Sequence, residues 1–258
     1  MHKMKSSDGT TVSYETRGSG PPLILIHGSF GDHKSNWEFV LPFFEKQFTV
    51  YAIARRGRGE TDATAGHSIE DESRDAAALI GQLSEPVFLL GHSYGAHVAS
   101  AAAALIPDKI RKLVLYEAIW PRIVGNDVLD SLEAQAKEDD WDGFAVSFFS
   151  NVLLVPMEEL DKLRLTDVWP PIIGDAKATL GDLRALNQYK FKPERFRELP
   201  MPILLQIGTE SPRDLYVTDV LLEVLPDARI GELEGQAHEG MTTAPKLYAE
   251  AVTKFLLP

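Results

Sequence analysis

The sequence predicts an α/β protein with a mostly parallel sheet flanked by helices, and three observations lead to that prediction. Short unbroken apolar runs, typical of strands buried on both faces, recur between residues 23 and 116. Stretches with the apolar spacing of helices separate these runs, and strands that alternate with helices usually form a parallel sheet. A serine flanked by glycines stands where one apolar run gives way to an alanine-rich helix.

The expected elements follow one another regularly through the first half of the chain. A strand with alternating polar and apolar residues covers residues 10–16. A turn rich in glycine and proline separates it from the next strand, at residues 23–26. Further strands are expected at 48–54, 86–90 and 112–116, and helices at 37–46, 68–83 and from 94 to 104.

The pattern changes over residues 120–198, where amphipathic segments such as 127–138 and 176–188 replace the strand-like runs. We interpret this stretch as a helical cap inserted into one core domain, which is made of residues 1–119 and 199–258. The core is expected to resume with strands at 202–207 and 228–233 and to close with a helix over 245–257.

Composition excludes several classes of function. A net charge of −12 argues against binding to nucleic acid or to an anionic membrane, since both require clustered Lys and Arg. The chain has no cysteine, so it can form no disulfide, thiolate metal site or cysteine nucleophile. Its first residues lack the apolar core of a signal peptide, and no stretch has the length of a membrane span. We therefore expect a cytoplasmic protein.

Ser93 is the candidate nucleophile. It lies in Gly91-His92-Ser93-Tyr94-Gly95, between a predicted strand and a predicted helix. A sharp strand-to-helix turn lifts the serine hydroxyl clear of the sheet, and the small flanking glycines leave room for that turn. The N-terminus of the following helix points free N–H groups at any oxyanion that forms beside Ser93.

A serine hydroxyl needs a base, almost always a histidine that a carboxylate orients. His238 is the best candidate, because it lies in a glycine-bounded loop between the last strand and the terminal helix. Loops that follow parallel strands gather at one edge of the sheet, so His238 and Ser93 are expected to meet there. The other histidines are assigned structural or surface positions; His2 and His67, in polar segments, are expected to be exposed to solvent.

These motifs resemble those of the α/β-hydrolase superfamily, and the resemblance covers essentially the whole chain. It rests on His27-Gly28-Ser29, on Arg56-Gly57-Arg58-Gly59-Glu60-Thr61-Asp62, on the Ser93 turn and on the His238 loop, which occur in the family's order. The resemblance implies an α/β-hydrolase fold with eight strands and a cap after strand 6. It further implies that Ser29 and Tyr94 donate backbone N–H groups to the oxyanion, and that Phe30 shapes the substrate pocket.

The orienting carboxylate departs from the family's common pattern. Members usually carry an aspartate after strand 7, and here Gly208-Thr209-Glu210-Ser211-Pro212 places serine at that position. Glu210 is one position early. Haloalkane dehalogenases carry the acid after strand 6, and their segment resembles Leu115-Tyr116-Glu117-Ala118-Ile119. We therefore favour Glu117, with Glu210 as the alternative.

A serine nucleophile implies acyl chemistry. Dehalogenases and epoxide hydrolases attack with aspartate, whereas an alkyl group on Ser93 would form an ether that water does not readily cleave. We expect a carboxylic-ester hydrolase that works through an acyl-enzyme on a small ester-like molecule. Alternatives on the same triad are a lactonase, a carbon–carbon bond hydrolase, a cofactor-free perhydrolase and a lyase; an alternative of another class is a ligand-binding receptor.

No metal or organic cofactor is expected. The pair Gly57 and Gly59 lacks the third glycine of a dinucleotide fingerprint. The predicted cap is rich in aromatic residues, and Trp120 is expected to line the pocket with Phe30. The substrate is accordingly expected to carry an apolar or aromatic group of modest size.

Overall fold

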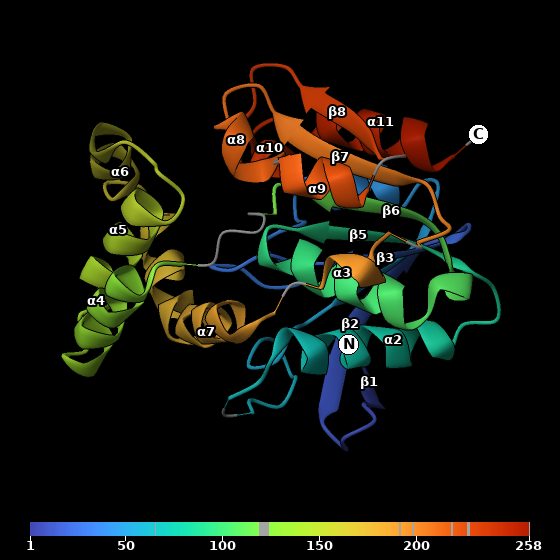
Figure 1. Cartoon of the computed structure of the whole chain (residues 1–258), viewed down its shortest axis with the longest axis horizontal. Helices are drawn as coiled ribbons and strands as arrows, with labels where there is room; N and C mark the ends of the chain where they lie inside the picture. The colour runs from blue at the N-terminus through green and yellow to red at the C-terminus, as the bar shows by residue number, and fades with distance from the viewer. Residues whose placement is uncertain are drawn as a thin grey trace.

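An eight-stranded sheet in the order β1-β2-β4-β3-β5-β6-β7-β8 forms the centre of the molecule (Figure 1). The computed structural model describes residues 1–64, 66–118, 124–190, 192–197, 199–217, 219–225 and 228–257. The β4–β3, β3–β5, β5–β6, β6–β7 and β7–β8 pairs are parallel, and the β1–β2 and β2–β4 pairs are antiparallel. The predicted mostly parallel sheet is thus confirmed. The strands are β1 (His2–Lys5), β2 (Thr11–Gly18), β3 (Pro22–Ile26), β4 (Thr49–Ile53), β5 (Val87–His92), β6 (Ile110–Tyr116), β7 (Ile203–Gly208) and β8 (Arg229–Leu233).

Two hydrophobic cores cover the two faces of this sheet, and successive residues of one strand enter opposite cores. In β3, Ile24 packs on one side and Leu25 on the other. The first core includes residues of α2 (Ile69–Gly81), α3 (Tyr94–Leu105) and α9 (Asp219–Val224). The second includes residues of α1 (Leu41–Phe44) and α11 (Pro245–Leu256). Strands buried on both faces explain why the sequence shows unbroken apolar runs.

Four helices between β6 and β7 gather at one end of the molecule, beyond the sheet (Figure 1). Three of them, α4, α5 and α7, share a separate hydrophobic core that includes Leu132, Phe144 and Leu183. The four helices are α4 (Asn126–Lys137), α5 (Trp141–Asn151), α6 (Met157–Leu163) and α7 (Trp169–Gln188). Short elements complete the described chain: η1 (Pro107–Lys109), η2 (Pro193–Arg195), α8 (Arg213–Tyr216) and α10 (Gly240–Thr243). Of the described helices, none is both long and apolar enough to cross a membrane.

The expected helix over residues 37–46 is wrong in extent. Only α1, at Leu41–Phe44, is helical, and the residues before it form turns. Pro42 lies in the first turn of α1, where its missing N–H costs no hydrogen bond. A proline at this position is typical of the start of a helix, so the helix begins here and not at residue 37. Trp37 is fully buried within these turns, so the apolar spacing that suggested a longer helix reflects packing against the sheet.

The strand order decides where the functional loops lie. β5 pairs with β3 on one side and with β6 on the other, and β7 and β8 follow beyond β6. All five strands are parallel, so the loops after their carboxyl ends emerge at the same edge of the sheet. These are the loops that carry residues 27–30, Ser93, Glu117, Glu210 and His238.

Candidate active site

Ser93 lies at the sharp turn between β5 and α3. Its backbone has φ 53° and ψ −122°, a combination that residues with side chains rarely adopt. A Cβ at Gly91 would press on the first turn of α3, and a Cβ at Gly95 would press on the end of β3. The Ser93 N–H donates to the carbonyl of Tyr116 at 2.8 Å, which ties the turn to β6. The serine is therefore held, half-buried, at the carboxyl edge of the sheet.

Glu117 and His238 form a close pair beside this turn. The Nδ1 atom of His238 lies 2.8 Å from Oε2 of Glu117. The other carboxylate oxygen, Oε1, accepts a hydrogen bond of 2.7 Å from the backbone N–H of Gly208 at the end of β7. Glu117 is only 2% exposed, and because both of its oxygens have donors the burial of its charge is compensated.

The two candidate carboxylates therefore occupy different environments. Glu117 follows β6 with φ 47° and contacts the histidine, whereas Glu210 lies exposed on the loop after β7. The backbone N–H of Glu210 donates to the carbonyl of Gln236, in the loop that also carries His238. The geometry favours Glu117 as the group that orients the imidazole.

The hydrogen bond to Glu117 also sets the proton chemistry of His238. Burial alone lowers the pKa of this imidazole, but the hydrogen bond that it donates to Glu117 and the negative charge of that carboxylate outweigh the effect, and the pKa is raised above its ordinary value. Because Nδ1 is engaged, Nε2 is the nitrogen available to accept a proton. Within the described part of the chain, no hydrogen bond joins His238 to the Ser93 hydroxyl; such contacts often form only when substrate is bound.

Two tyrosines fix the loop that carries His238. The Tyr116 hydroxyl donates to the carbonyl of Ala237 and accepts a hydrogen bond of 3.0 Å from the N–H of Gly240. The ring of Tyr216 stacks on the imidazole, with centroids 5.7 Å apart and planes at 22°. The sequence points to neither residue, because an aromatic side chain gives no local sign of which loop it will contact.

The family resemblance assigns the backbone N–H groups of Ser29 and Tyr94 to an oxyanion hole, and this role stays a prediction. Among the described residues, no acceptor is bonded to the N–H of Ser29, although the amides on either side of it are bonded. Tyr94 is the first residue of α3, where a helix offers its N–H no partner. A Cβ on Gly28 would lie 3.1 Å from Cβ of Ser93, so the loop after β3 is next to the serine.

Phe30 packs into the helical segment that follows β6. Its ring lies 4.8 Å from the ring of Phe148 and 5.1 Å from that of Phe149, measured between centroids. The residue is half-buried and has φ 54°, an unusual value for a side chain of this size. Its expected role in the pocket stays a prediction, and Trp120 lies outside the described residues.

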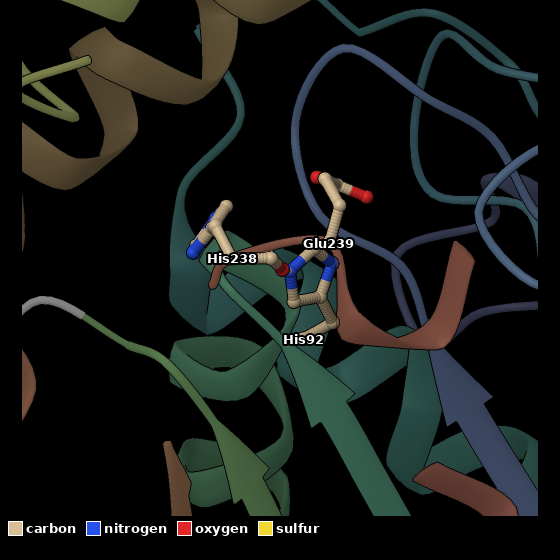
Figure 2. Close-up of side chains that lie close together, drawn as sticks. All are labelled: His92, His238 and Glu239. Atoms are coloured by element: carbon tan, nitrogen blue, oxygen red, sulfur yellow. The ribbon is translucent and has the colours of Figure 1, made fainter. Parts of the chain in front are cut away.

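His92, His238 and Glu239 form a group that offers possible metal ligands within 4.8 Å of one another. Figure 2 shows His92 at the end of β5, next to the loop that carries the other two residues. The nitrogens of His92 already face partners, the Asn36 side-chain oxygen at 3.1 Å and the His238 carbonyl at 3.0 Å. With Nδ1 of His238 bonded to Glu117, the group favours proton transfer over metal binding.

A second group of possible ligands, His67, Glu72 and Asp182, lies deeper in the protein. The guanidinium groups of Arg55 and Arg58 occupy this cluster and pair with the carboxylates, so a further cation would meet two positive charges. The expectation that His67 is exposed is wrong: its side chain is 8% exposed and lies 3.7 Å from Asp182. Gly181 and Asp182 of α7 lie against its ring, a contact that the sequence around His67 does not reveal.

The chain matches known hydrolases along almost its full length. The model of the "Alpha/beta hydrolase family" matches residues 23–251. A 2-(acetamidomethylene)succinate hydrolase of Mesorhizobium japonicum is 24% identical over 95% of this chain and 91% of its own length. A non-heme chloroperoxidase of Streptomyces lividans is 26% identical over 96% of both chains. The solved structure of an alpha/beta hydrolase from Sphaerobacter thermophilus is 27% identical, covers 99% of this chain and 100% of that one, and superposes with a TM-score of 0.86.

Proposed function

This chain belongs to the alpha/beta hydrolase family, and we propose that it is a serine hydrolase that cleaves a carboxylic ester through an acyl-enzyme. Ser93 is the nucleophile, His238 the base and Glu117 the orienting acid. The observation that carries the proposal is the pair formed by buried Glu117 and half-buried His238, at the same sheet edge as the strained turn of Ser93.

In the first half of the reaction, Nε2 of His238 takes the proton of the Ser93 hydroxyl as its oxygen attacks the ester carbonyl. Glu117 stabilises the imidazolium that forms, while both of its oxygens keep their donors. The tetrahedral oxyanion is placed to accept hydrogen bonds from the N–H groups of Ser29 and Tyr94. Collapse of this intermediate breaks the bond to the leaving alcohol, which receives the proton from His238.

In the second half, water attacks the acyl group on Ser93, and His238 removes a proton from the attacking water. The second tetrahedral intermediate releases the carboxylic acid, and His238 returns the proton to the Ser93 oxygen. Every proton that moves is held by Nε2 of His238, so these residues suffice for the proposed cycle.

We assign residues 120–198 the role of a cap over this site and residues 1–119 and 199–258 that of the catalytic core. The aromatic residues of the cap, with Phe30 packed among them, favour a small substrate with an apolar or aromatic group.

The similarity to a chloroperoxidase over 96% of the chain favours perhydrolysis as a second candidate reaction. In that reaction, hydrogen peroxide would replace water as the attacking molecule and release a peroxycarboxylic acid from Ser93.

The test is labelling by a fluorophosphonate, which phosphonylates activated serines with loss of fluoride, together with turnover of 4-nitrophenyl esters. We expect labelling and hydrolysis by the wild-type protein and neither by the Ser93→Ala variant. A panel with lactones, diketones, and esters supplied with peroxide then ranks the acyl-transfer candidates. Failure of the folded wild-type protein to label or to turn over any of these compounds would contradict a catalytic function and leave a binding protein on this scaffold.

A further inference from the structure

The first half of the loop of residues 27–30, after β3, is bonded to residues of the core. The side chain of Arg55, at the end of β4, donates from Nε to the carbonyl of His27 and from Nη2 to that of Gly28, both at 2.9 Å. The N–H of Gly28 donates to the side-chain oxygen of Asn36 at 3.0 Å. These bonds fix the first half of the loop.

The second half of the same loop is bonded to helix α7. The Ser29 hydroxyl donates to Oδ2 of Asp182 at 2.7 Å, and the N–H of Phe30 donates to the Thr179 hydroxyl at 3.1 Å. Thr179 and Asp182 are one turn apart on α7, and both are fully buried. One face of this helix is therefore hydrogen-bonded to two consecutive residues of the loop.

Asp182 is itself held firmly in place. It accepts two hydrogen bonds from Arg55, at 2.9 and 2.8 Å, and two from Arg58, at 3.1 and 2.7 Å. Burial alone raises the pKa of the Asp182 carboxyl, but the two guanidinium groups outweigh burial and hold that pKa well below its usual range. An ionised carboxylate fixed by four donors is a rigid acceptor for the Ser29 hydroxyl.

The contacts with α7 leave one amide of the loop for another use. The N–H groups of Gly28 and Phe30 are bonded, whereas that of Ser29, between them, has no acceptor in the described residues. Phe30 keeps a positive φ of 54°, which its bond to Thr179 and its contact with the Phe148 ring, 4.8 Å away, help to maintain. The direction of the Ser29 N–H therefore depends on the position of α7 relative to this loop.

We propose that Thr179 and Asp182 are positioning residues that aim the Ser29 N–H at the oxyanion, so that the cap helix assembles half of the oxyanion hole. This inference rests on the proposed acyl-transfer function. It predicts that a substrate large enough to keep α7 from bonding to the Ser29 loop would still bind but would turn over slowly. Discrimination between substrates would then show in kcat more than in KM.

The test removes each bond without removing the charge of Asp182. Thr179→Val and Ser29→Ala each delete one hydroxyl, and we expect kcat for 4-nitrophenyl butyrate to fall by about 10-fold to 100-fold with KM changed by less than about 2-fold. Thr179→Ser, which keeps the hydroxyl, should retain most of the wild-type kcat. Ser147→Ala is the matched control, because its hydroxyl bonds to Gln135 within the cap, at 2.9 Å, and should leave kcat unchanged.

The binding of phenylboronic acid, which forms a tetrahedral adduct with an active serine, gives a second readout; its affinity should fall in parallel with kcat. If the wild-type protein is active and both deletions lower only the melting temperature, the two residues are merely structural and the inference is overturned while the proposed function stands. If the wild-type protein neither turns over the ester nor labels at Ser93, the proposed function fails and this inference fails with it.

Discussion

The two halves of the candidate site are held in different ways. Among the described residues, the pair of Glu117 and His238 is held by the core, through Gly208, Tyr116, Tyr216 and the backbone of β7. The loop with Ser29 is shared between the core and helix α7. The difference teaches that proton transfer and oxyanion stabilisation need not respond alike when the cap is perturbed, and four predictions test that separation.

The largest effect is expected at the acid. Glu117→Gln should lower kcat by about 10³-fold to 10⁴-fold, since an amide no longer stabilises the imidazolium and favours the wrong tautomer of His238. Steady-state kinetics of 4-nitrophenyl butyrate hydrolysis measure the change. Glu210→Gln is the control and should stay within about 2-fold of wild type; the reverse pattern would move the acid to the loop after β7.

The next effect concerns stability at the junction of cap and core. Asp182→Asn leaves the buried guanidinium groups of Arg55 and Arg58 short of one negative charge, and we expect a loss of about 3–5 kcal/mol in the free energy of unfolding. Urea titration followed by circular dichroism measures it. Glu133→Gln breaks an exposed ion pair between α4 and Arg184 of α7, the helix that also carries Asp182, and should cost less than about 1 kcal/mol. Equal losses in both variants would mean that the buried cluster does not join the two regions.

A smaller effect is expected on the side of the site that the core holds alone. Tyr116→Phe removes the hydroxyl that bridges Ala237 and Gly240, and should cost about 1–3 kcal/mol of stability and lower kcat by displacing His238. Tyr248→Phe is the control: its ring packs 5.1 Å from that of Tyr116, and its buried hydroxyl has no partner among the described residues. A variant of Tyr116 with unchanged kcat would show that the loop holds His238 without this bridge.

The smallest effect is a change in pH dependence. His238 must be neutral to accept a proton, and its pKa is raised, so kcat/KM should increase as the pH rises through a value above that of a free imidazole. Glu117→Gln removes the charge that raises the pKa and should move this limb to lower pH. Thr179→Val should lower the plateau and leave the limb in place. If the limb moved equally in both variants, the pair of Glu117 and His238 would depend on α7 as the Ser29 loop does, and the separation of the two would be contradicted.

The candidate site residues could be proposed from the sequence because each follows a predicted strand, and their roles stay predictions. Apolar runs located β3, β5 and β6, and the strand-like segment 228–233 located β8; the segments that follow them carry Ser29, Ser93, Glu117 and His238. Parallel strands send these residues to one edge whatever the details of packing. The choice between Glu117 and Glu210 stayed open in the sequence, because both follow neighbouring strands of that edge.

Packing between distant segments decided what the sequence left open or placed wrongly. The spacing of Trp37 and its neighbours suggested a long helix, yet the same residues pack onto the sheet from turns. His67, Arg55 and Asp182 are polar or charged residues, which most often lie at the surface. They are buried together only because α7 crosses the loops of the core, and Asp182 lies 153 positions from the Ser29 that it contacts.

By itself, the sequence determined the parallel sheet, the serine turn and the loop of the histidine, since apolar periodicity and the small size of glycine act over a few residues. Only the tertiary structure decided which carboxylate meets His238 and that helix α7 grips the Ser29 loop. Both depend on hydrogen bonds and ion pairs between segments brought together by folding, whose partners carry no local signal in the chain.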